Sequence, residues 1–157
     1  RPKLLVLDEP FSGLDPVVRE DVTQGLLAAV QLGETTAIIS SHDIDEVERL
    51  ADHVALLEDG GLRFAEPTDV LLGRFRRIEV DQAEAISRGN LPGTWLNWQA
   101  EANRAAFVES GYDAATTERA CGERFPAATV RAHPMSLREI FVTLARNDRP
   151  QTQGVAA

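Results

Sequence analysis

Residues 4–15 read Leu-Leu-Val-Leu-Asp-Glu-Pro-Phe-Ser-Gly-Leu-Asp. The four aliphatic residues at the start predict a strand that is buried on both faces of a parallel sheet. Asp8 and Glu9 follow at the carboxyl end of this strand, where parallel sheets bind their ligands. Pro10 cannot donate a further ladder hydrogen bond, so the strand is expected to end there. Such a pair of carboxylates suits a Mg²⁺ ligand beside a base that activates water.

A helix, a second strand and a histidine follow along the chain. Apolar residues recur at helical spacing within residues 16–32, and Gly33 is expected to end this helix. Residues 35–40 are rich in β-branched side chains and predict a strand that leads directly into Ser41-His42-Asp43. His42 is therefore expected on a turn between a strand and a helix.

The next helix and a hairpin complete the first part of the chain. Asp43 and Glu46 predict a capping box at the start of the helix after His42. Two apolar runs, residues 54–57 and 62–65, flank the turn signal Gly60-Gly61 and predict a β-hairpin.

Residues 4–15 resemble the Walker B motif and D-loop of ATP-binding cassette (ABC) ATPases, and Ser41-His42-Asp43 resembles the switch histidine, or H-loop, of that family. The resemblance implies ATP and Mg²⁺ as cofactors. It implies that Asp8 holds Mg²⁺, that Glu9 polarises the attacking water and that His42 contacts the γ-phosphate. The implied D-loop, which crosses the interface of an ATPase dimer, consists of Ser12, Gly13, Leu14 and Asp15.

Other motifs of the family are missing. A P-loop needs the pattern Gly-x-x-x-x-Gly-Lys-Ser/Thr, whereas the only lysine of this chain is Lys3, between Pro2 and Leu4. The signature motif Leu-Ser-Gly-Gly-Gln and the Q-loop are absent as well. The sequence is therefore expected to be the downstream portion of a nucleotide-binding domain. This chain alone is expected to bind ATP negligibly and to be inactive as an ATPase.

Charge is distributed unevenly along the 157 residues. Residues 1–74 carry six Lys and Arg against fifteen Asp and Glu, whereas residues 75–157 carry ten of each kind. An acidic chain without a basic patch argues against nucleic acid as a partner, because phosphate contacts need clustered Lys and Arg. A single cysteine, Cys121, excludes an internal disulfide and is expected to be a small buried hydrophobe.

The second half predicts the element order β-α-β-β-α-β of a ferredoxin-like fold. The predicted strands and helices are, in order, residues 76–81, 82–87, 95–101, 104–110, 112–123 and 127–133. Ala102-Asn103 is expected to make the hairpin turn. On a regular strand Trp95 and Trp98 would point to opposite faces, which favours packing over an effector pocket.

A last helix is expected from Ser136, with Leu137, Ile140, Phe141 and Leu144 on one face and a capping box formed by Ser136 and Glu139. This stretch resembles the closing helix of ATPase subunits of ABC-2-type exporters. The fold class is therefore expected to be α/β, with a partial P-loop NTPase parallel sheet followed by a small α+β ferredoxin-like domain. The expected domains are residues 1–74 and 75–147, with a disordered tail at 148–157.

As a whole, the resemblance implies an ATP-hydrolysing subunit of an ABC transporter, with export as the expected direction. Its implied partners are a second ATPase subunit, identical or not, and transmembrane permease subunits that hold it at the cytoplasmic face of the membrane. Two alternatives stay open. The chain could be a non-enzymatic dimerisation or regulatory module, or part of a soluble ABC ATPase that is not linked to transport.

Overall fold

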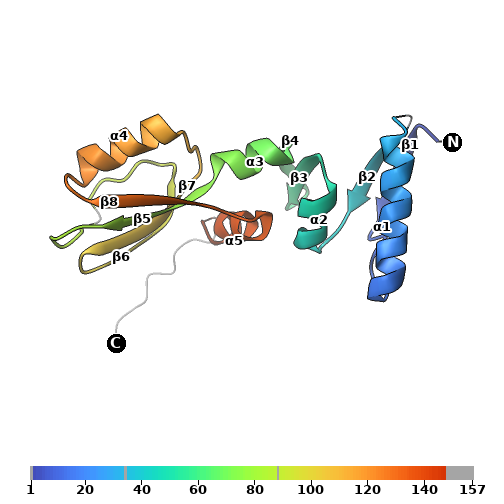
Figure 1. Cartoon of the computed structure of the whole chain (residues 1–157), viewed down its shortest axis with the longest axis horizontal. Helices are drawn as coiled ribbons and strands as arrows, with labels where there is room; N and C mark the ends of the chain where they lie inside the picture. Colours follow the sequence, from blue (N-terminus) through green and yellow to red (C-terminus); the bar gives the residue numbers. More distant parts are fainter. Residues whose placement is uncertain (1, 34, 88, 148–157) are drawn as a thin grey trace. The chain divides into compact units, whose positions relative to one another are not determined.

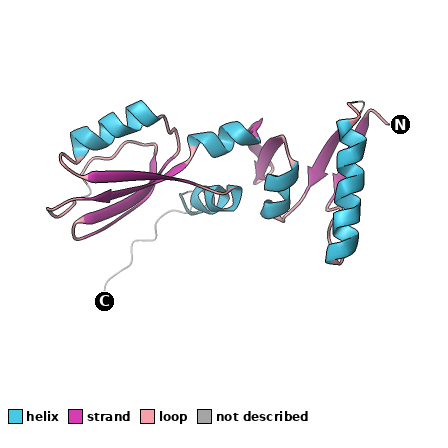
Figure 2. Ribbon diagram, viewed as in Figure 1, coloured by secondary structure: helices cyan, strands magenta, loops and turns pink. Residues whose placement is uncertain are grey.

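The computed structural model describes residues 2–33, 35–87 and 89–147, so the tail expected at 148–157 lies outside the described residues. The chain forms two compact units, Arg1–Ala51 and Asp52–Ala157, whose helices and strands are shown in Figures 1 and 2. The fold is mixed α/β, as the sequence predicts. The division into domains after residue 74 stays a prediction.

The first unit alternates strands and helices. Its elements are β1 (Leu4–Asp8), α1 (Pro16–Gln31), β2 (Thr36–Ser40) and α2 (Ile44–Leu50). Strands β1 and β2 pair in parallel, with Leu4 opposite Thr36 and Asp8 opposite Ser40. Helix α1 ends as predicted, because Gly33 takes a φ of +74° that favours glycine and its N–H donates to Val30 O at 2.9 Å.

The prediction that β1 is buried on both faces is wrong for the described structure. Side chains alternate between the two faces of the β1–β2 ribbon, and Leu5 and Leu7 are half-buried. On the other face Leu4 is 52% exposed, Val6 70% and Ile38 56%. Two strands and two helices supply too little structure to cover both faces of the ribbon.

The second unit begins with a hairpin and ends with a helix. Its elements are β3 (His53–Glu58), β4 (Gly61–Pro67), α3 (Thr68–Arg74), β5 (Arg76–Asp81), β6 (Trp95–Glu101), β7 (Arg104–Glu109), α4 (Ala114–Arg124), β8 (Thr129–Pro134) and α5 (Leu137–Asn147). Strands β3 and β4 form the predicted antiparallel hairpin. Its turn residues Asp59 and Gly60 have φ values of +49° and +77°, as a tight hairpin turn with two left-handed residues requires.

Four antiparallel strands form a sheet in the order β6-β7-β5-β8. This order agrees with the predicted ferredoxin-like arrangement, but the helix predicted at residues 82–87 is not formed. The N–H of Gln82 donates to Asn103 O at 3.1 Å, and the N–H of Ile86 donates to Ala102 O at 2.8 Å. A helix over 82–87 would need the N–H of Ile86 to donate to Gln82 O, but this N–H is engaged by the β6–β7 turn.

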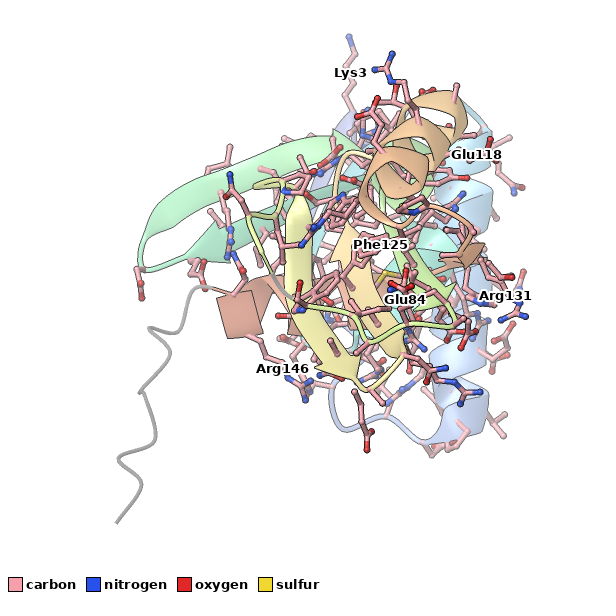
Figure 3. The ribbon with its side chains drawn as sticks, turned by 90° about the vertical axis from the view of Figure 1, so that its left-hand side faces the viewer. Lys3, Glu84, Glu118, Phe125, Arg131 and Arg146 are labelled. Carbon is pink, nitrogen blue, oxygen red and sulfur yellow. The ribbon has the colours of Figure 1, made fainter. Side chains whose placement is uncertain are left out.

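Aromatic side chains form the core between the sheet and α4. Trp95 and Trp98 lie on the same face, with ring centroids 6.3 Å apart, so the prediction of opposite faces is wrong. The register of β6 shifts between its two ends, and Asn97 has a φ of +51°, which marks a bulge that changes the alternation. Phe107 and Phe125, the latter labelled in Figure 3, complete the cluster and are 2% and 4% exposed.

Helix α5 begins as predicted. The N–H of Ser136 donates to Glu139 Oε2 at 2.9 Å, and the N–H of Glu139 donates to Ser136 Oγ at 3.3 Å, which confirms the capping box. Leu137 and Ile140 are fully buried, as the predicted apolar face requires. No helix among the described residues is both long and apolar enough to cross a membrane.

Cys121 on α4 is fully buried and carries a free thiol, which confirms the expectation of a small buried hydrophobe. Burial, together with the nearby charge of Glu109, raises the pKa of the thiol to about 11. The thiol therefore stays protonated and unreactive at neutral pH.

Candidate functional site

The candidate site lies within the first unit, where the carboxyl ends of β1 and β2 meet. The two strands run in parallel with Asp8 opposite Ser40, so the residues that follow both strands emerge at one edge. The Ser40 hydroxyl donates a short hydrogen bond to Asp8 Oδ1. The last residues of the two strands are thereby joined through their side chains as well as their backbones.

Glu9 leaves the strand with an uncommon backbone conformation. Its φ is +47°, in the left-handed region that residues other than glycine rarely adopt. Its N–H lies 3.2 Å from Ser40 O and 3.0 Å from Ser40 Oγ. Strain of this kind is concentrated at functional sites, where the surrounding structure holds it in place.

The side chains of Glu9 and His42 meet. Glu9 Oε2 lies 2.7 Å from His42 Nδ1, and the two side chains are 37% and 77% exposed. The hydrogen bond to Glu9 and the charge of its carboxylate raise the pKa of His42, and the charges of Asp43 and Glu46 add to this effect. The pair thus joins residues 33 positions apart in the sequence at an edge that is open to solvent.

We expect the pKa of His42 to fall when Glu9 is replaced by Gln, because the amide has no charge to stabilise the imidazolium. NMR titration of the His42 ring protons in the 157-residue chain measures it. A raised pKa in the folded chain means that the pair stabilises the fold below the unfolded pKa of His42, and that this contribution is lost as pH rises through the folded value.

Asp21→Asn is the matched control for this titration, since it makes the same chemical change at an exposed position on α1. This variant should leave the pKa of His42 raised. An unchanged pKa in Glu9→Gln would show that the two side chains do not pair in solution.

A turn over residues 10–13 follows Glu9 and leads into the segment 12–15. The N–H of Ser12 donates to Glu9 O at 3.1 Å, and Gly13 has a φ of +73°. Asp15 Oδ1 accepts hydrogen bonds from the N–H groups of Val17 and Val18 at 3.0 and 3.1 Å, so its carboxylate caps helix α1. The structure thus brings Asp8, Glu9 and His42 to one edge, and the segment 12–15 leads from the turn after Glu9 into helix α1.

Arg19 is a residue that the sequence analysis missed. Its Nη1 lies 3.3 Å from Asp43 Oδ2 and 3.0 Å from Glu46 Oε1, which links the start of α1 to the start of α2. The capping box predicted for Asp43 and Glu46 is therefore wrong: the Asp43 side chain makes no capping hydrogen bond, and both carboxylates face Arg19 instead. A sequence signal for this contact exists, because Arg19 is the only basic residue in α1 and can pair with acidic residues elsewhere in the unit.

The donor set at this edge fits Mg²⁺. Mg²⁺ is usually held by one or two carboxylates together with phosphate oxygens and water, and not by a cage made only of protein groups. Asp8 is exposed and supplies such a carboxylate, with one oxygen bonded to Ser40. Among the described residues, no group of three or more His, Cys, Asp or Glu side chains is placed to hold a metal.

No protein-family model matches the chain. It is 34% identical over 96 residues to the ABC transporter ATP-binding protein YtrB of Bacillus subtilis, an overlap of 59% of this chain and 33% of that protein. It is 38% identical over 76 residues to the bacitracin transport ATP-binding protein BcrA of Bacillus licheniformis, covering 48% and 25% of the two chains. The trimethylamine N-oxide transport system ATP-binding protein TmoW of Ruegeria pomeroyi is 33% identical over 98 residues. This overlap covers 57% of this chain and 28% of that protein.

The mixed α/β fold is consistent with part of an ABC ATPase domain, and these relatives support the P-loop NTPase class. Their names describe ATP-binding proteins of transporters. The chain spans a third or less of the length of each of these three relatives.

Proposed function

We propose that the chain is the downstream part of the ATP-hydrolysing subunit of an ABC transporter, from the Walker B motif onward. The observation that carries the proposal is the 2.7 Å contact between Glu9 and His42, at the edge where Asp8 ends its parallel strand. Relatives named as transporter ATP-binding proteins support the same function. The fold alone does not support this function, because proteins with one fold can have many different functions.

Each residue has a separate task in this proposal. Asp8 holds Mg²⁺, Glu9 accepts a proton from the attacking water, and His42 donates a hydrogen bond to the γ-phosphate. When bound, Mg·ATP would supply the phosphoryl group, and its Mg²⁺ would neutralise part of the charge on the phosphate oxygens. The segment 12–15 is the D-loop, which contacts the second ATPase subunit. The raised pKa of His42 favours a protonated ring that can act as a donor.

The partners and the location are part of the proposal. A second ATPase subunit completes the nucleotide sites, and transmembrane permease subunits hold the protein at the cytoplasmic face of the membrane. Export is the proposed direction, supported by the resemblance of the stretch from Met135 to Phe141 to exporter subunits. The names of the three relatives reported above state no direction of transport.

We further propose that residues 75–147 form an accessory domain with a ferredoxin-like sheet. The order β6-β7-β5-β8 supports this proposal, although a loop replaces the first helix of that fold. The alternative function, a dimerisation or regulatory module, would use this domain.

ATP turnover of a full-length protein that carries this chain tests the proposed function. We expect His42→Ala to lower kcat by about 10²- to 10³-fold, because a donor aimed at developing charge is lost. His53→Ala on β3 is the matched control, and it should keep wild-type turnover. Wild-type kcat in His42→Ala would contradict the role of His42, and absence of ATP hydrolysis by the wild-type protein would contradict the function itself.

A further inference from the structure

Ser40 contacts both residues of the carboxylate pair, although it belongs to neither sequence motif of the site. It is the last residue of β2 and lies directly opposite Asp8 in the parallel register. Its hydroxyl donates the short hydrogen bond to Asp8 Oδ1 and accepts the N–H of Glu9 at 3.0 Å. One hydroxyl has one donor and two acceptor positions, so both bonds can exist together.

The bond to Asp8 orients that carboxylate. With Oδ1 engaged by Ser40, rotation of the carboxylate at the strand end is restrained. Among the described residues no hydrogen bond to Oδ2 is found, so this oxygen is the one open to an outside ligand. Loss of a group that orients a metal ligand in this way typically costs about 10- to 100-fold in metal affinity or activity.

The bonds to Glu9 fix a strained backbone. The left-handed conformation of Glu9, with φ at +47°, needs partners that hold its peptide group in place. Ser40 supplies two of them, its carbonyl oxygen at 3.2 Å and its hydroxyl at 3.0 Å from the N–H of Glu9. From this backbone position the Glu9 side chain reaches His42 Nδ1 at 2.7 Å.

We propose that Ser40 is a positioning residue that assigns different tasks to the two adjacent carboxylates. Its hydroxyl turns one oxygen of Asp8 outward for a divalent cation, and it holds the backbone of Glu9 so that the neighbouring carboxylate faces His42. The catalytic part of this inference rests on the proposed function. The geometric part concerns this chain alone and can be tested without any nucleotide.

The first test uses the 157-residue chain and NMR titration of His42. Three carboxylates bear on this ring, those of Glu9, Asp43 and Glu46. In Ser40→Ala the contact with Glu9 should loosen, and the pKa of His42 should fall towards its ordinary value. Ser40→Thr keeps the hydroxyl and should keep the raised pKa. Thr36→Ala removes a hydroxyl from the other end of β2 and should also leave it raised.

The second test measures ATP turnover of the full-length protein against Mg²⁺ concentration. Ser40→Ala should raise the Mg²⁺ concentration for half-maximal activity by about 10- to 100-fold. It should also lower kcat, with little change in KM for ATP. Ser40→Thr should restore both quantities, whereas a role limited to strand stability would leave the Mg²⁺ dependence unchanged.

The outcomes separate the two levels of the proposal. If the wild-type protein does not hydrolyse ATP, the proposed function fails and the titration still decides the geometry. If Ser40→Ala leaves both the pKa of His42 and the Mg²⁺ dependence at wild-type values, or if Ser40→Thr behaves like Ser40→Ala, the role of the hydroxyl is refuted. Should Ser40→Ala not fold, Ser40→Cys, with a weaker donor, is expected to show the same losses.

Discussion

Replacing Glu9 by Gln in a full-length protein that carries this chain is expected to lower ATP turnover by about 10²- to 10⁴-fold while ATP still binds. The amide keeps the size of the carboxylate, so the shape of the site at the end of β1 is retained. It cannot accept a proton from the attacking water, so the step that Glu9 is proposed to assist loses its base. Turnover by phosphate release and binding by calorimetry with Mg·ATP measure the two effects separately.

The control for this experiment is again Asp21→Asn, an exposed carboxylate on α1 that should keep wild-type kcat and affinity. A loss of ATP binding in Glu9→Gln, equal to the loss of turnover, would indicate a role in binding and not in catalysis. Wild-type kcat in the variant would contradict the assignment of Glu9.

The second large effect concerns stability. Phe107→Ala is expected to destabilise the second unit by about 3–5 kcal/mol, because it leaves a cavity in the aromatic core. Phe107 is 2% exposed and its ring centroid lies 4.0 Å from that of Trp95 and 5.6 Å from that of Trp98. The chain has two tryptophans, both in this cluster, so urea unfolding followed by tryptophan fluorescence reports on this unit.

The free energy of unfolding typically falls by about 1–3 kcal/mol per molar urea. The expected loss of stability therefore lowers the urea concentration at the unfolding midpoint by about 1 M or more. Val142→Ala on α5 is the control, because Val142 is 43% exposed and its truncation should change the free energy of unfolding by about 0.5 kcal/mol or less. Equal midpoints for Phe107→Ala and Val142→Ala would contradict the packing described for the core.

Local sequence signals predicted most elements of the fold. The apolar run ended by Asp8, the helix ended by Gly33 and the hairpin at Ala102 lie where spacing and turn chemistry placed them. The capping box of Ser136 and Glu139 is also local, since both partners lie within one helical turn. Signals of this kind act over a few residues and survive without knowledge of the tertiary structure.

Two of the errors have the same physical cause, which is contact between segments distant in sequence. The segment 82–87 is not helical because its backbone bonds to the β6–β7 turn. The capping box at Asp43 fails because Arg19, 24 residues away, engages its carboxylate. The tryptophan pair shares one face because of a bulge at Asn97, which no alternation pattern reveals.

For the candidate site, the resemblance of the motifs predicted Asp8, Glu9 and His42. The structure brings these three residues together at the carboxyl ends of β1 and β2. The resemblance did not name Ser40, because a serine at the end of a strand is common and its importance depends on the register that places it opposite Asp8. The roles of the site residues stay predictions, as do the D-loop contacts of the segment 12–15.

A crystal structure of the full-length Glu9→Gln variant with Mg·ATP tests the central claim most directly, since slow turnover should trap the bound nucleotide. The claim predicts the Mg²⁺ ion beside Asp8, the γ-phosphate within hydrogen-bonding distance of His42, and the side chain at position 9 facing the water in line with that phosphate. A triphosphate bound elsewhere, with Asp8 and His42 away from it, would contradict the account.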